Sequence, residues 1–227
     1  DALVRRNYGE FDFDPASVSH LILTHAHIDH SGLVPRLIKK GFKGQVLCTA
    51  PTMELCKIML PDSARVEMSE LEWKNRKRER AGKPVREPLY TLEEAQTSLS
   101  YFKPCDYGKS VDLGNGFKVK FLDAGHILGS AILEVRYSGN GKETVVVFSG
   151  DLGSLHQEIV KDPAHPTSAD FLLVESTYGD RPHKSREETV KEFVSIIEEA
   201  GKQKGNIVIP AFAIERTQEL LYELCVL

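Results

Sequence analysis

The sequence predicts a mixed α/β (α+β) fold in which stacked sheets are flanked by helices. Apolar runs of strand length and amphipathic runs of helix length alternate irregularly, without the strict strand–helix alternation of a parallel α/β domain. In addition, side chains that can bind metals follow the ends of several predicted strands. Strand ends that carry ligands favour a fold in which those ends gather at one edge.

Composition limits the class of protein. The 227 residues are 41% hydrophobic and 27% charged, which is ordinary for a soluble protein with one large domain or slightly more. No apolar run approaches the ~20 residues of a membrane span, and no signal-peptide pattern opens the chain, so we expect a soluble, cytoplasmic protein without membrane contact. The four cysteines lack CxxC spacing and are expected to be free thiols.

The first part of the chain alternates strands with helices. Residues 18–24 are apolar and have the length of a buried strand. A short helix is predicted over residues 33–40, and a second apolar strand over residues 45–50. A helix over residues 51–60 follows, because Pro51 is suited to the first helical position.

Two helices are expected before the chain turns to strands. Residues 68–86 are polar and highly charged, which predicts a long exposed helix that ends near residues 82–84. Thr91 and Glu94 have the spacing of a capping box and predict a helix to about Leu99.

The middle of the chain is predicted to be an antiparallel meander. Its short apolar segments are separated by Asn-Gly type turns, which join hairpin strands. The predicted strands cover residues 110–113, 117–123, 131–137 and 144–148. A further buried strand is expected over residues 171–175.

The last part of the chain returns to helices. Ser185 and Glu188 form a second capping box, which predicts a helix over residues 185–200. A strand is predicted over residues 207–210 and an amphipathic helix over residues 215–224.

Residues 24–30 (THAHIDH) place three imidazoles and one carboxylate within six positions, directly after the first strand. His25 and His27 continue the alternation of that strand, so we expect both side chains on the same side, as two ligands of one ion require. Asp29 and His30 fall in the following turn, within reach of a second ion, since two-metal hydrolytic sites hold their ions about 3.5–4 Å apart. A polar strand end with separately hydrogen-bonded histidines is the alternative explanation.

Two later loops add one potential ligand each. His126 follows the predicted strand that ends at Asp123, and Asp151 follows the one that ends at Phe148. Glycines flank both residues and let backbone segments come close. Together with residues 24–30, these loops predict a metal centre. The remaining histidines, expected to be surface or packing residues, are His20, His156, His165 and His183.

Positive charge is concentrated in residues 73–86, which contain seven basic residues and one acidic residue in a chain of formal charge −4. A solvated helix face and a contact with RNA phosphates are both open interpretations. The candidates for phosphate contacts are Arg76, Lys77 and Arg78, together with Arg216 at a predicted helix start.

The ligand pattern resembles that of the metallo-β-lactamase superfamily, which is HxHxDH, then a single histidine, then a single aspartate. All three parts occur here in that order. The resemblance implies an αββα sandwich that holds two Zn²⁺ ions. By the resemblance, one zinc is held by His25, His27 and His126, the second by Asp29 and His30, and Asp151 bridges both. Neutral imidazoles suit zinc, and a bridging carboxylate reduces the repulsion between two dications.

Residues 174–181 (VESTYGDR) and 209–216 (IPAFAIER) resemble the first acidic motif and the strand-to-helix turn of the β-CASP branch, whose nucleases process RNA and, in some members, DNA. By that resemblance Glu175 orients a histidine that donates a proton. Asp29 and Glu175 are therefore the candidate catalytic residues.

The resemblance also implies a domain division. Residues 1–180 would form a metallo-β-lactamase domain that lacks its first strands, and residues 181–227 would begin an inserted β-CASP domain. The family pattern places an acidic residue before Asp1 and two further histidines after Leu227. We therefore expect a fragment that binds metal but cleaves poorly alone.

The functional prediction is a zinc-dependent phosphodiesterase, a ribonuclease of the β-CASP type, that cleaves RNA through attack of a metal-bound hydroxide. One alternative is a small-molecule metallo-hydrolase of the thioesterase or lactamase type, against which residues 174–181 and 209–216 argue. The other is a non-catalytic RNA-binding relative, against which the intact ligands argue. Expected partners are RNA and either a second copy of the chain or a processing complex.

Overall fold

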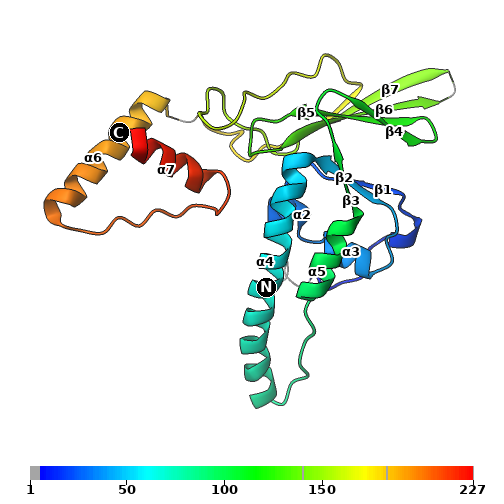
Figure 1. Ribbon diagram of the computed structural model, residues 1–227, viewed down its shortest axis with the longest axis horizontal. Coiled ribbons are helices and arrows are strands. Elements are labelled where there is room, and N and C mark those ends of the chain that lie inside the picture. Colours follow the sequence, from blue (N-terminus) through cyan, green and yellow to red (C-terminus); the bar gives the residue numbers. More distant parts are fainter. Residues whose placement is uncertain (1–5, 140, 183, 227) are drawn as a thin grey trace.

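The computed structural model describes residues 6–139, 141–182 and 184–226, which form two sheets with helices beside them. One sheet has three strands in the order β1-β2-β3, and the other has five in the order β4-β5-β6-β7-β8. Figure 1 shows the five-stranded sheet lying across one end of the long helix α4 (Ala50–Arg80). The predicted mixed α+β class is confirmed.

The smaller sheet is parallel and contains one strand that the sequence did not predict. Its strands are β1 (His20–Ile22), β2 (Gln45–Thr49) and β3 (Phe102–Cys105), with β2 in the centre. The strand β3 was missed because it contains Pro104, which lacks the N–H needed in a central strand. Its edge position in the sheet makes the proline acceptable.

Short helices follow β1 and precede β3. The helices α2 (Ile28–Ser31) and α3 (Val34–Lys39) come directly after the histidine-rich segment, so Asp29 and His30 lie in a one-turn helix rather than in the expected turn. The helix α5 (Leu92–Ser98) begins with the predicted capping box and continues into the short 3-10 helix η2 (Leu99–Tyr101).

The two helices predicted over residues 51–60 and 68–86 form one continuous helix, α4, of 31 residues. Pro61 lies inside it and removes one helical hydrogen bond. The helix nevertheless continues, because Leu60, Pro61 and Ala64 are buried in the core. Packing of this kind supplies most of the stability of helices in proteins and here outweighs the local cost of proline.

The larger sheet contains the predicted antiparallel meander. It consists of β4 (Ser110–Gly114), β5 (Phe117–Asp123), β6 (Ala131–Gly139) and β7 (Lys142–Phe148), and β8 (Phe171–Leu173) adds to β7 in parallel. The expectation that the strand near residue 171 is buried is wrong, because β8 is an edge strand whose three residues are 52–62% exposed.

The two sheets stack through an apolar core. Between the three-stranded sheet and α3, α4 and α5, the core includes Phe42, Leu60 and Tyr90. Between the two sheets, Leu47 of β2 packs in one cluster with Phe121 of β5. The stacked-sheet prediction is therefore confirmed.

The outer face of the larger sheet is covered by the loop of residues 149–170, rather than by helices, in the part of the chain that the structure describes. Leu152 packs against the cluster that contains Val147. The backbone N–H of Ala164 donates to the carbonyl of Asp123 over 2.8 Å. These contacts fix the loop that follows β7 against the sheet.

The last two helices, α6 (Arg186–Gln203) and α7 (Arg216–Val226), lie apart from the sheets in Figure 1. The predicted capping box at Ser185 is present. The prediction of a strand over residues 207–210 is wrong, since these residues are exposed and form no ladder with a described strand. An apolar run becomes a strand only beside a pairing partner.

The cysteines are free, as predicted. Cys48, Cys56 and Cys105 are buried, and Cys225 is exposed. Burial raises the pKa of the Cys56 thiol to about 12, which is typical of an unreactive core thiol. In the described residues, none of the helices has the length and apolarity needed to cross a membrane.

Candidate metal centre

His25 and His27 extend from β1 into the space between the sheets. The carbonyl of Thr24 accepts a hydrogen bond from the N–H of Ala131 in β6 over 2.9 Å. The Thr24 hydroxyl lies 3.1 Å from Nδ1 of His25, so this contact engages Nδ1 and leaves Nε2 facing the other imidazoles. His25 is fully buried, and its Nε2 lies 3.2 Å from Nδ1 of His27. The prediction that both side chains share one side is confirmed.

His126 lies in the loop between β5 and β6, and Ser130 fixes its backbone. The Ser130 hydroxyl accepts hydrogen bonds from the N–H groups of His126 and Ile127 over 3.0 and 3.2 Å. The Tyr107 hydroxyl donates to the Ser130 carbonyl over 2.8 Å. This loop places Nε2 of His126 at 3.2 Å from Nδ1 of His27.

The start of α4 holds the same loop from a second side. The carbonyl of Gly129 accepts hydrogen bonds from the hydroxyls of Thr49 and Thr52, over 2.6 and 2.9 Å. Gly129 has φ +86°, and a Cβ there would lie 2.6 Å from the backbone nitrogen of Thr52. Sequence reasoning missed the two threonines, because their spacing suggests at most a helix cap.

Asp151 lies in the loop after β7, and its neighbours connect it to the rest of the centre. The N–H of Leu152 donates to Oε1 of Glu175 over 2.7 Å. A Cβ on Gly153 would lie 1.5 Å from the carbonyl oxygen of Gly125, so only glycine permits this approach of the two loops. The prediction that glycines let the ligand loops come close is confirmed.

Four of the predicted ligands converge on one point. The ligand atoms of His25, His27, His126 and Asp151 all lie within 4.8 Å of one another. Oδ2 of Asp151 lies 3.7 Å from Nε2 of His25 and 3.6 Å from Nε2 of His126. Ligands about 2.0–2.2 Å from a tetrahedral ion are about 3.3–3.6 Å apart. The observed separations therefore fit a single metal ion.

His30 and Asp29 lie beside the other oxygen of Asp151. Nε2 of His30 is 3.3 Å from Oδ1 of Asp151 and 3.6 Å from Oδ2 of Asp29. The Asp29 side chain is 77% exposed, whereas the His30 side chain is 30% exposed. The structure thus brings both residues next to Asp151, on the side away from the three-histidine group.

Burial keeps the histidines of the main cluster neutral. It lowers the pKa of His25 to about 2, with further lowering by His30, His27 and His126. Burial also lowers the pKa of His27 and is the largest influence in His126. Neutral imidazole is the form that binds a metal ion, so the environment favours binding.

Glu175 supports the Asp151 loop directly. Burial acts to raise the pKa of the Glu175 carboxyl, but hydrogen bonds from Leu152 and Thr177 outweigh burial, and the pKa is lowered. The backbone N–H of Glu175 also donates to the Ser149 hydroxyl over 3.1 Å. The sequence did not predict this contact with the Asp151 loop.

The turn before α7 reaches the edge of the centre. The ring of Phe212 lies 6.1 Å from the ring of His27. Glu215 is only 8% exposed and adopts φ +73°. Oε1 of Glu215 and Nε2 of His27 are buried without a hydrogen-bond partner among the described residues. Sequence reasoning gave these residues no role, although they lie in or beside the motif over residues 209–216.

The predicted RNA contacts lie outside the cluster. Arg216 is paired with Glu219 over 2.8 Å, and its side chain is 68% exposed. Arg76, Lys77 and Arg78 lie in the last turns of α4. The other histidines are separate from the site: His20 is half-buried, His156 and His165 are exposed, and His183 lies outside the described residues.

Comparison with known proteins identifies relatives over nearly the whole chain. Ribonuclease TTHA0252 of Thermus thermophilus is 38% identical over 96% of this chain and 46% of its own length. Transcription termination factor FttA of Methanococcus maripaludis is 34% identical, over 92% of this chain and 31% of its own. Endoribonuclease YSH1 of Eremothecium gossypii is 31% identical, over 94% and 26%. The chain thus spans less than half the length of these relatives.

The family model described as the metallo-beta-lactamase superfamily matches residues 1–210. The three relatives are of the RNA-processing kind that the β-CASP resemblance implied, so that resemblance is confirmed. The match includes every residue of the metal cluster as well as His30 and Asp29. The chain belongs to the metallo-β-lactamase superfamily.

Proposed function

We propose that this chain provides the metal-binding part of a phosphodiesterase that cleaves RNA. The observation that carries the proposal is the 38% identity with a ribonuclease over 96% of the chain. The gathered ligand set of His25, His27, His126 and Asp151 supports it, because a relative that had lost activity would have no need to retain the complete cluster.

Two zinc ions are the cofactor in this proposal. The first is held by the three-histidine group and Oδ2 of Asp151, whose separations match tetrahedral zinc. The second is held by His30 and Asp29, because the other oxygen of Asp151 faces His30 at 3.3 Å. A carboxylate whose two oxygens face different nitrogens is suited to bridge two ions.

Bound zinc supplies a Lewis acid and lowers the pKa of a water molecule from 15.7 to about 7. The chain's own residues hold the geometry for that chemistry. Asp151 is kept in place through the hydrogen bond from Leu152 to Glu175. Glu175 also lies close enough to His126 to influence its pKa, so one carboxylate links both ligand loops.

The wider assignments are also proposals. We assign residues 1–180 to the metallo-β-lactamase domain and residues 181–227 to the β-CASP domain, because α6 and α7 lie apart from the sheets (Figure 1). Action in the cytoplasm, on RNA, as a homodimer or within a processing complex, agrees with the printed functions of the relatives.

The products of cleavage test the proposal. If water attacks the phosphodiester, the products carry a 5′-phosphate and a 3′-hydroxyl, and a single 2′-deoxy sugar at the scissile linkage does not protect the RNA. A 2′,3′-cyclic phosphate product, or complete protection by that sugar, would contradict the proposal. His126→Ala should abolish cleavage, and the matched variant His165→Ala should retain it, because His165 is exposed and remote from the cluster.

The alternative of a small-molecule hydrolase is tested with a nitrocefin-like β-lactam and a thioester. Turnover of either substrate by the wild-type protein, lost in His126→Ala, together with intact RNA, would favour the alternative.

A further inference from the structure

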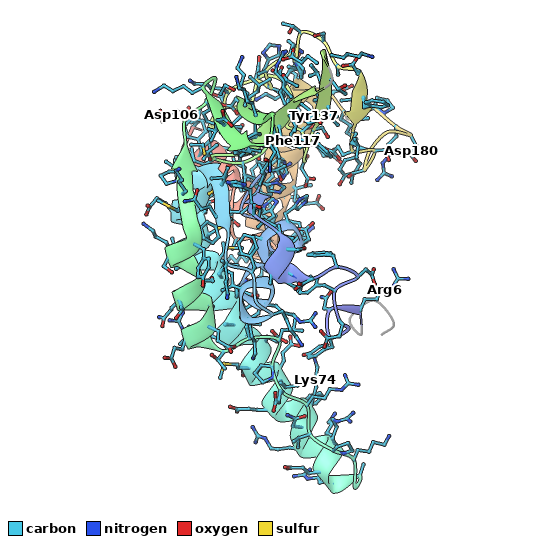
Figure 2. The ribbon with its side chains drawn as sticks, turned by 90° about the vertical axis from the view of Figure 1, so that its right-hand side faces the viewer. Arg6, Lys74, Asp106, Phe117, Tyr137 and Asp180 are labelled. Atoms are coloured by element: carbon cyan, nitrogen blue, oxygen red, sulfur yellow. The ribbon has the colours of Figure 1, made fainter. Side chains whose placement is uncertain are left out.

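The end of α4 and the chain that returns from it form a projecting arm, residues 73–86, which we call the basic arm. The last buried residue of α4 is Leu71, and beyond it the helix runs on to Arg80 without core contacts. Figure 2 shows Lys74 on this part of the helix, well beyond the sheets. The basic arm therefore presents its side chains on several sides.

Hydrogen bonds hold the returning chain against the helix. The Asn75 side chain donates to the carbonyl of Arg86 and accepts from its N–H, over 2.8 and 2.9 Å. Nε of Arg78 donates to the carbonyl of Pro84 over 2.7 Å. The returning chain thus places Lys83 and Arg86 beside the basic helix turns. The basic arm is a defined surface rather than a frayed end.

Most of the positive charge on the basic arm is not neutralised by the protein. Lys74 pairs with Glu70 over 2.6 Å. No ion pair joins an acidic residue to the other cations in the part of the chain that the structure describes, and these cations are Arg76, Lys77, Arg78, Arg80, Lys83 and Arg86. Adjacent unpaired cations repel one another, and a polyanion relieves that repulsion.

An exposed aromatic ring lies among these cations. Trp73 is 55% exposed, and Nζ of Lys77 lies 3.4 Å from the centre of its ring. A positive surface that also offers an aromatic face is suited to single-stranded nucleic acid, because bases stack on the ring while cations contact the backbone. An acidic protein segment would use the charge but would have no base to stack.

The distance from the metal centre sets which part of the RNA is contacted. Thr52 holds the His126 loop, and Lys77 follows it by 25 residues on the same helix, which is ~37 Å at 1.5 Å per residue. With about 3.4 Å per stacked nucleotide, this distance corresponds to roughly 11 nucleotides.

We propose that the basic arm binds the single-stranded flank of the RNA about ten nucleotides from the bond that is cut. This inference rests on the proposed function, since it assumes that RNA reaches the metal centre. The arm acts as an anchor that gives long substrates an advantage over short ones.

The binding test uses the wild-type protein and a 24-nucleotide oligoadenylate with phosphorothioate linkages, which slow cleavage. The arm variant is Arg76→Gln, Lys77→Gln and Arg80→Gln; Arg78 is left intact because it holds Pro84. The control variant removes the same charge elsewhere, as Lys43→Gln, Lys118→Gln and Lys142→Gln, at exposed lysines without ion pairs.

The arm variant should bind this RNA more weakly than the wild type and with a smaller salt slope. Each lost contact lowers the slope by about 0.7, so three contacts make the wild-type advantage shrink by about 20-fold between 50 and 200 mM salt. The control variant should lower the slope less. Equal affinities and slopes for the wild type and the arm variant would overturn the proposal.

Trp73 provides a local signal, because it is the only tryptophan in the sequence. Its emission should change when the 24-nucleotide RNA binds and should not change with polyglutamate at equal charge. A change with polyglutamate alone would assign the arm to an acidic protein partner and overturn the RNA proposal.

Cleavage kinetics separate this proposal from the proposed function. The ratio of KM for a 6-nucleotide RNA to KM for a 24-nucleotide RNA should be several-fold larger in the wild type than in the arm variant. Wild-type cleavage with the same ratio in both proteins would overturn the anchor alone. Absence of RNA binding and cleavage in the wild type would overturn both proposals.

Discussion

The two threonines at the start of α4 hold the loop that carries His126, and valine substitutions measure how much they contribute. Valine keeps the shape of threonine and removes the hydroxyl. In Thr52→Val the Gly129 carbonyl keeps its bond from Thr49, so the expected loss is about 1 kcal/mol of unfolding free energy. Thr49 also accepts the Thr52 N–H as the cap of α4, so Thr49→Val should cost about 2 kcal/mol.

The double variant is the decisive one. It leaves the Gly129 carbonyl buried without a partner, which costs about 1–3 kcal/mol for that group alone. We expect the loss to exceed the sum of the two single losses, because both hydroxyls serve one acceptor. Outer contacts of this kind also change metal affinity by about 10–100-fold, so zinc should bind correspondingly more weakly.

The assays are urea unfolding of the chelator-treated protein and a competition titration with zinc. Thr49→Ser and Thr52→Ser retain the hydroxyls and should restore both properties. Unfolding free energies that simply add, together with zinc affinity within twofold of the wild type, would refute the proposed role of the two threonines.

Three further predictions follow from the same site. Gly153→Ala should displace the Asp151 loop and lower both stability and zinc affinity, because its Cβ would meet the Gly125 carbonyl, whereas Gly201→Ala, in an open helical position, should be neutral or stabilising; equal unfolding curves for the two variants would contradict this. In the metal-free protein, buried histidines with lowered pKa bind fewer protons than the unfolded chain below pH 6.5, so unfolding free energy should fall with decreasing pH, by up to about 1.4 kcal/mol per pH unit and histidine. Urea titrations at pH 7.5 and 5.5, with His165→Gln as control, measure this loss, and a flat profile would refute it. Glu175→Gln keeps an acceptor for the Leu152 N–H and should retain more zinc affinity and activity than Glu175→Ala; identical affinities and rates in both variants would argue against a positioning role for Glu175.

The metal ligands were predictable because their signal is local. Three imidazoles and a carboxylate in six residues follow a strand, and the chain has little freedom there to separate them. His126 and Asp151 follow strands of a meander whose turns the sequence marks clearly. The structure confirms that His25, His27, His126 and Asp151 converge.

The supporting contacts were not predictable, because they depend on segments far apart in the sequence. Thr49 and Thr52 are about 80 positions from Gly129, and their hydroxyls carry no pattern that names a partner. The continuity of α4 through Pro61 likewise depends on burial, which overrides the local tendency of proline to end a helix. Edge position, rather than composition, decides the exposure of β8.

The claim on which the account depends most is that Asp151 joins two metal positions through its two carboxylate oxygens. Elemental analysis of purified protein, dialysed against zinc and then against metal-free buffer, tests it most directly. The wild type and the exposed control Asp62→Ala should each retain two zinc equivalents. Asp151→Ala should retain at most one, because Oδ2 faces the three-histidine group and Oδ1 faces His30. Two full equivalents of zinc in Asp151→Ala would contradict the bridging role.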